Sequence, residues 1–320
     1  MKPPLYRAAL AHSWHLSWKE HRLWPFGLFA AALGQMGIID ALVQLWFTAR
    51  GYRPGGGIAV LSDLFYTGFI TSDIPREVMS WMLFLLLVFV GFGVLFTFLA
   101  VVSQGALVHN TAESVRRGKR TDTSISWHAG VRAFWCVFTV NILKKIVLGL
   151  VGILVALFSW PILFSLGGSP ILFLLVFLFA AAVSLVMSIV AMYAIGYLVV
   201  EKYTLLQSLV GGWKLFVEHW LVSLEVGFVI FVLDLILSLV LVTAVFVSLL
   251  PAFLAYLFAL LFSSSIVFVL GIALSAVVFL LFMFLLAAVF STFTTAIWTY
   301  LFMQMHKTGL KSHVLHWLGK

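Results

Sequence analysis

Charged residues are scarce in this 320-residue chain and are absent from three long segments. Asp, Glu, Lys and Arg together make up 9% of the residues, and none of them occurs within residues 78–112, 146–200 or 235–306. A soluble domain carries about 25% charged residues, so this composition excludes a soluble globular protein. Because one bilayer crossing needs roughly 20 mostly apolar residues, the two longer segments must each hold more than one membrane span.

Cysteine and the familiar catalytic patterns are also missing. Cys136 is the only cysteine, so no intrachain disulfide can form. The chain has no Gly-rich phosphate loop, no Gly-x-Ser-x-Gly elbow, no His-Glu-x-x-His helix and no cysteines at metal-binding spacing. We therefore expect a protein that is not an enzyme and that holds no cofactor or metal.

Apolar residues make up 63% of the chain, and turn-forming residues divide them into six predicted spans. The spans are expected at about residues 23–49, 78–108, 146–166, 171–200, 220–250 and 266–305. The predicted fold class is all-α, with residues 1–320 forming one transmembrane domain, a six-span helical bundle. Residues 251–265 leave a seventh span open, but roughly 15 residues are short for a crossing, so an interfacial or re-entrant helix is preferred.

The distribution of Lys and Arg predicts the orientation. With six spans, sixteen of these residues fall in the segments on the side of the two termini and three fall on the other side, at Arg50, Arg53 and Arg76. Cytoplasmic loops carry the excess of Lys and Arg, so both termini are expected in the cytoplasm. The net charge of +8 is therefore explained by topology, and we expect membrane lipids rather than nucleic acid as partners.

A threefold pattern runs through the chain. An amphipathic stretch precedes each odd-numbered span, at residues 5–24, 123–138 and 204–220, with Thr123 and Thr204 as predicted N-caps. Such stretches are typical of interfacial helices that lie in the headgroup plane. They suggest three hairpin repeats at about residues 5–108, 123–199 and 204–305. The alternative is that any cytoplasmic connection in a membrane protein has this composition.

Two of these stretches carry a resemblance to a known family. The segments SWHLSWKEHRLWPFGLF and GYLVVEKYTLLQSLVGGWKLFVEHWLVSLE resemble bacterial inner-membrane proteins of the YciC type, which are related to the membrane domain fused to some glycerophosphodiester phosphodiesterases. The resemblance implies a six-helix domain in the bacterial cytoplasmic membrane. It does not imply the enzyme, because His21-Arg22 is followed by Leu23 where the catalytic loop has glycine, and no soluble stretch could form the catalytic barrel.

The strongest candidate for an intramembrane functional residue is Asp234. It lies fourteen residues after Trp220, or about 21 Å along a helix, and a charge at the centre of a span costs about 2.5–3.5 kcal/mol. Its sequence neighbours Leu233 and Leu235 offer no partner. Asp234 is either a proton, cation or gating site, or a protonated side chain that hydrogen-bonds across helices.

Other polar residues have both structural and functional interpretations. Glu225 lies at a similar depth to Lys144 and Lys145, so we expect either an ion pair between these helices or lysines that extend to the interface. Asp40 is expected on a tightly packed or hydrated helix face, and Gln104 and Asn110 are expected to hydrogen-bond between helices. A basic cluster is predicted to contact lipid headgroups and consists of Arg116, Arg117, Lys119 and Arg120.

Two functions follow as hypotheses. The first is a non-enzymatic inner-membrane protein that binds lipid, organises the membrane, or scaffolds a membrane-protein partner or a second copy of itself. The second is a small secondary transporter or channel that uses Asp234 as a coupling or gating site, because transporters use repeats and ionisable residues near the midplane.

Overall fold

The computed structural model describes residues 5–35, 76–118, 122–164, 170–262 and 265–308, and every regular element in these ranges is a helix. Five helical segments are long and apolar enough to cross a membrane: Ser80–Arg117, Thr123–Leu154, Leu178–Glu201, Trp220–Leu261 and Ser265–His306. A polytopic all-α membrane protein is thereby confirmed. Only the beginning of the first predicted span lies within the described residues, so the count of six spans stays a prediction.

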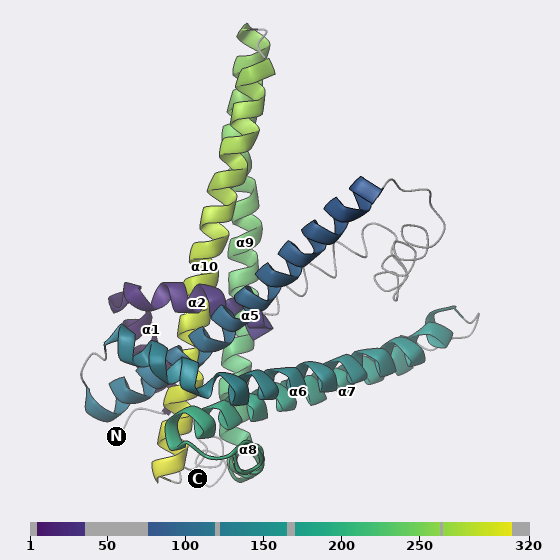
Figure 1. Ribbon diagram of the computed structural model, residues 1–320. Helices are drawn as coiled ribbons and strands as arrows, with labels where there is room; N and C mark the ends of the chain where they lie inside the picture. Colours follow the sequence, from purple (N-terminus) through teal and green to yellow (C-terminus); the bar gives the residue numbers. More distant parts are fainter. Residues whose placement is uncertain (1–4, 36–75, 119–121, 165–169, 263–264, 309–320) are drawn as a thin grey trace.

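The helices divide the molecule into a packed hub and three arms that diverge from it (Figure 1). The long helices are α5 (Arg76–Arg117), α6 (Thr123–Phe164), α7 (Pro170–Gly196), α9 (Trp220–Phe262) and α10 (Ser265–Thr308). Shorter helices complete the hub and are α1 (Leu5–Lys19), the 3-10 turn His21–Leu23, α2 (Trp24–Ala30), the π-helices Ala31–Gln35 and Tyr197–Glu201, and α8 (Leu205–Glu218).

The hub is defined as these short helices together with residues 100–117, 123–141, 189–201, 220–234 and 288–306 of the long ones. Its interior contains fully buried side chains such as Val101, Tyr193 and Ile297. Polar side chains are buried there as well, among them Gln104 and Asn141. The hub therefore has the close-packed, partly polar interior of a folded domain.

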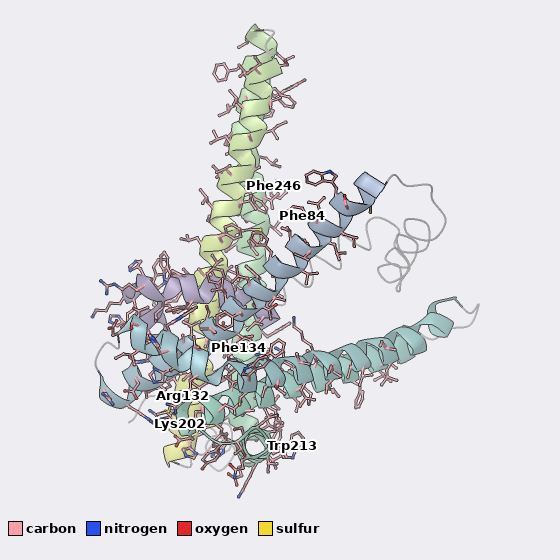
Figure 2. The ribbon with its side chains drawn as sticks, in the orientation of Figure 1. Phe84, Arg132, Phe134, Lys202, Trp213 and Phe246 are labelled. Atoms are coloured by element: carbon pink, nitrogen blue, oxygen red, sulfur yellow. The ribbon has the colours of Figure 1, made fainter. Side chains whose placement is uncertain are left out.

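The arms are residues 76–99, residues 142–164 with 170–188, and residues 235–262 with 265–287. Their side chains point outward on most sides, as Phe84 and Phe246 do at 57% and 69% exposure (Figure 2). Each helical leg of an arm has roughly 20–28 residues, which is about 30–42 Å and sufficient for one crossing of the hydrocarbon core. The candidate membrane-spanning segments include these arms and continue into the hub, where the other ends of the long helices pack together.

This arrangement differs from the predicted bundle of six packed spans. The described helices pack together in the hub and within the α6–α7 and α9–α10 hairpins, and beyond the hub the arms separate (Figure 1). The physical reason is that a helix surface that is apolar all round is satisfied by lipid as well as by a protein neighbour, so its sequence specifies insertion but not packing.

The predicted interfacial stretches have two different outcomes. α1 and α8 are separate helices, and α8 begins with the expected cap, in which Thr204 and Gln207 form a capping box. The second stretch, residues 123–138, is not a separate helix but the first part of α6, since no helix-breaking residue separates it from the span. Its N-cap is Asp122 rather than Thr123, because the Asp122 carboxylate accepts a hydrogen bond from the Ser124 N–H.

Residues 251–265 form neither a separate interfacial helix nor a seventh span. α9 continues through Pro251 to Phe262. The Ala252 N–H, next to the proline, donates a hydrogen bond of 2.8 Å to the Ser275 hydroxyl on α10. A serine on a neighbouring helix that partners the backbone is one way in which membrane helices tolerate proline.

Candidate functional site

A cavity of about 470 Å³ opens on the hub between α5, α6 and the end of the π-helix Tyr197–Glu201. We call it the hub pocket. It is lined by His109, His128, Ala129, Arg132, Ala133, Cys136, Leu198, Val199, Lys202 and Tyr203. Figure 2 shows Arg132 and Lys202 on the same part of the hub. No lining residue is acidic, so the hub pocket combines positive charge with small apolar side chains.

Lys202 holds an unusual backbone conformation at the rim of the hub pocket. Its φ of 58° lies in the left-handed region, and it is the only non-glycine residue with positive φ among those described. It ends the π-helix, where its N–H donates to the Tyr197 carbonyl. Glycine is the usual residue at such a helix end, and a non-glycine residue there costs about 1–2 kcal/mol. The Lys202 side chain thus lies at the hub pocket because its backbone adopts an energetically unfavourable conformation.

The two arginines of the predicted basic cluster that the structure describes are each paired with a glutamate. Arg116 pairs with Glu201 at 2.8 Å, and Arg117 pairs with Glu113 at 2.7 Å. Lys119 and Arg120 lie outside the described residues. In contrast, neither Arg132 nor Lys202 forms an ion pair with any residue that the structure describes. The positive charge available to a ligand therefore comes from these two residues and not from Arg116 and Arg117.

Two histidines add polar atoms to the hub pocket. The His128 Nδ1 lies 2.8 Å from the Ser124 carbonyl, which accepts a hydrogen bond only if Nδ1 carries the proton, and this leaves Nε2 for another partner. The buried Nδ1 of His109 has no hydrogen-bond partner within the described ranges. In the same ranges no group of three or more His, Cys, Asp or Glu side chains is placed to hold a metal ion.

Aromatic side chains border the hub pocket on α6. Trp135 is 73% exposed, and its ring contacts those of Phe134 and Phe138. Tryptophan concentrates at the boundary between lipid tails and headgroups. Trp135 lies about one turn from Arg132 along α6.

A second cavity, of about 190 Å³, lies where the arms leave the hub, and we call it the junction cavity. Asp234 of α9 and Lys144 of α6 both line it. The other lining residues are Leu185, Ser188, Ile189, Met192, Gly227, Ile230, Phe231, Thr294 and Trp298. The Oδ1 atom of Asp234 is buried and has no hydrogen-bond partner among the described residues. The structure thus places Asp234 beside a cavity and not against lipid alone.

The predicted hydrogen bonds between helices are confirmed. The Asn141 side chain of α6 donates to the Gln104 carbonyl oxygen of α5 at 2.7 Å, and Asn110 of α5 donates to the Ser126 hydroxyl of α6 at 3.3 Å. The pairing of Glu225 with Lys144 or Lys145 stays a prediction. Asp40 lies outside the described residues.

The sequence did not indicate that Arg132 and Lys202 line one cavity. Nor did it indicate that Asp234 and Lys144 line another. Members of each pair lie on different helices, and no spacing pattern joins them. The one available signal was local: Glu201 and Lys202 follow an apolar run and precede the Thr204 cap, so they lie near the bend between two helices. No family model, curated protein or solved structure matches this chain.

Proposed function

We propose that this chain is a non-enzymatic multi-pass protein of the bacterial cytoplasmic membrane that binds the anionic headgroup of a phospholipid in the hub pocket. The observation that carries the proposal is the convergence of Arg132 and Lys202 on one cavity without an acidic lining residue. Arginine and lysine are the side chains that bind phosphate, arginine by two parallel hydrogen bonds and lysine as a compact charge.

The surroundings of the hub pocket favour a lipid over a soluble anion. Ala129, Ala133, Leu198 and Val199 provide an apolar wall beside the two cations. The exposed Trp135 and the apolar arms support a position of this wall at the edge of the hydrocarbon layer. A ligand with a phosphate and attached acyl chains would meet both parts of the site, whereas inorganic phosphate would leave the apolar part empty.

The orientation of the protein is part of the proposal. The excess of Lys and Arg on one side supports a cytoplasmic hub with both termini in the cytoplasm. The resemblance to YciC-type inner-membrane proteins supports the same membrane. The hub pocket would then face the inner leaflet, whose anionic lipids attract basic side chains.

Native mass spectrometry of the full chain released from mild detergent tests this function. Phosphatidylglycerol and phosphatidylcholine with identical acyl chains are added in turn, and the fraction of protein that retains lipid is measured. We expect retention of phosphatidylglycerol by the wild type and its loss in Arg132→Gln and Lys202→Gln. Removing a hydrogen bond to a charged group costs about 1.5–3 kcal/mol, which corresponds to an affinity roughly 10- to 150-fold lower.

Arg117→Gln is the matched control, because it removes the same charge from an arginine that is paired with Glu113 and does not line the hub pocket. It should retain phosphatidylglycerol as the wild type does. An equal loss in all three variants would mean that lipid responds to total charge, and the hub-pocket proposal would be wrong.

Lys202→Gly separates binding from folding. Glycine adopts the left-handed conformation without strain, so this variant should be at least as stable as the wild type in a thermal melt. It should nevertheless lose phosphatidylglycerol like Lys202→Gln. Unchanged lipid retention in a stable Lys202→Gly protein would remove the lysine from the proposed site.

A further inference from the structure

The junction cavity brings together charges of opposite sign from two long helices. Asp234 comes from α9 and Lys144 from α6, and α7 and α10 close the remaining walls. Both side chains are partly buried beside apolar residues. A carboxylate in such surroundings needs a partner that offsets its lost hydration. The buried Oδ1 of Asp234, which has none within the described ranges, can still accept a hydrogen bond.

The charges of the lining decide which class of ligand fits. The formal charges of Asp234 and Lys144 cancel, so the cavity favours neither a lone cation nor a lone anion: either one would face one charge of its own sign. A ligand that carries both signs would meet an opposite charge at each wall. Phe231 and Trp298 add aromatic surface, which also attracts an ammonium group.

We propose that the junction cavity binds a zwitterion with a primary ammonium group and an anionic group a few bonds apart. The ammonium donates a hydrogen bond to the carboxylate of Asp234, and the anionic group accepts one from the ammonium of Lys144. The volume of about 190 Å³ corresponds to about six water molecules at roughly 30 Å³ each. It suits a headgroup of the ethanolamine phosphate type or a small amino acid, but not a larger metabolite.

The source of this chemistry is either a membrane lipid or a free solute. Phosphatidylethanolamine presents an ammonium and a phosphate at the end of acyl chains, and the arms beside the cavity offer apolar surface to such chains. A free amino acid carries the same two charges without the chains. The proposal is independent of the hub pocket, because the two cavities share no lining residue.

Thermal unfolding of the purified full chain in detergent tests the proposal. Four additions are compared with buffer: phosphatidylethanolamine, phosphatidylcholine with the same acyl chains, glycine, and ethanolamine phosphate. Phosphatidylcholine is the key comparison because its quaternary ammonium has no N–H to donate to Asp234. We expect the wild type to be stabilised by phosphatidylethanolamine at concentrations at least about tenfold below those at which phosphatidylcholine acts.

Asp234→Asn should abolish this preference, and Lys144→Gln should weaken the stabilisation by both lipids, because it removes the donor to the phosphate that they share. Arg132→Gln, in the hub pocket, should keep it, which separates a failure here from a failure of the proposed function. Stabilisation by glycine or ethanolamine phosphate, lost in the same two variants, would identify a free zwitterion as the ligand. The proposal is overturned if Asp234→Asn keeps the preference, or if no zwitterion stabilises the wild type, which would leave Asp234 and Lys144 as structural groups only. If either variant fails to fold, the wild type alone tests the proposal. It should be stabilised more by phosphatidylethanolamine, which has a primary ammonium, than by phosphatidylcholine, which has a quaternary one.

Discussion

The hub and the arms belong to the same long helices, but different contacts stabilise them. In the hub, α5 and α6 come so close at Gly130 that an added Cβ would overlap the Val102 carbonyl oxygen. In the α6 arm, a Cβ added at Gly149 would meet no atom within 4 Å. Close approach of backbones through small residues is the main device of helix packing in membranes. The hub uses that device, and this part of the α6 arm does not.

Polar side chains show the same contrast. The hub contains hydrogen bonds between helices, such as those from Asn141 to Gln104 and between Tyr193 and Ser223. Hydroxyl groups on the arms mostly bond back to their own helix, as Thr97 does to the Gly93 carbonyl. A hydrogen bond between helices fixes their register, whereas a bond within one helix does not. Hydrogen bonds between helices are thus concentrated in the hub, while the α9–α10 arm also has one, from the Ala252 N–H to the Ser275 hydroxyl.

The largest difference between the arms and the hub is expected in the yield of membrane-inserted protein when a charge replaces an exposed leucine in each region. Leu239→Arg places a charge on the α9 arm, where the wild-type side chain is 67% exposed. Arginine near the centre of a span costs about 2.5–3.5 kcal/mol on insertion scales. We therefore expect a clear drop in the amount of membrane-inserted protein, measured in membrane fractions by immunoblot.

Leu206→Arg is the counterpart on α8 of the hub, at 75% exposure. Its charged group can reach water or headgroups while its carbon chain stays on apolar surface. The yield of inserted protein should stay near that of the wild type. Equal losses at both positions would mean that the hub surface near α8 lies as deep in the membrane as the arm.

Two glycines of α6 provide the next test. Gly130→Ala forces the backbones of α5 and α6 apart in the hub, and overpacking of this kind costs about 1–3 kcal/mol. Gly149→Ala meets open space in the arm and should stabilise the helix by up to about 1 kcal/mol. The two variants should thus shift the unfolding midpoint in detergent in opposite directions. A loss of stability in Gly149→Ala would show that the α6 arm packs against protein at that point.

The sequence was sufficient for the parts of the fold that depend on local chemistry. Helix limits at Trp220, Pro170 and Ser265 agree with the predicted spans to within a residue or two, because Gly, Pro and Ser end helices locally. The capping box at Thr204 was predictable for the same reason. Pro251 misled the prediction, since its effect depends on Ser275, which lies on another helix.

The arrangement of the spans and of the two cavities could not be predicted from one sequence. Leucine, valine and phenylalanine cover the helices on all sides, so periodicity does not reveal which face meets a neighbour. Lys144 illustrates the consequence. Its depth in α6 suggested Glu225 as a partner, and that pairing stays a prediction. The structure also places Lys144 around a common cavity with Asp234, about two and a half turns further along α9 than Glu225. Depth along a helix constrains only one coordinate of a contact.

Loss of one hydrogen bond should change the free energy of unfolding more in the hub than in the arms, but this difference is smaller than the preceding ones. Asn141→Leu keeps the branched shape of the side chain but leaves the Gln104 carbonyl oxygen without the donor that it has in the hub. A net hydrogen bond contributes about 1 kcal/mol, and an orphaned buried partner adds to the loss. Thr97→Val removes only a bond within the α5 arm and should change stability by less than about 0.5 kcal/mol. Denaturant titration in detergent measures both, and equal effects would contradict the contrast between the regions.

The smallest expected effect concerns pH and the contact of α1 with α10. The His12 ring lies 5.2 Å from that of Tyr300, and burial, together with the charge of His15, lowers the pKa of His12 from its usual 6.5. The unfolded chain therefore binds a proton at a higher pH than the folded hub does, so acidification below about pH 6.5 should destabilise the hub until the folded protein is protonated as well.

His12→Gln should weaken this dependence when unfolding midpoints at pH 5.5 and pH 7.5 are compared. Ser13→Ala, a buried neighbour that does not titrate, should keep the wild-type difference even if its overall stability changes. An identical pH dependence in His12→Gln would mean that other groups set it. α1 is part of the hub and packs on α10. A pH effect that requires His12 would therefore also show that unfolding in detergent reports on the hub. Each comparison of stability between the two regions depends on that.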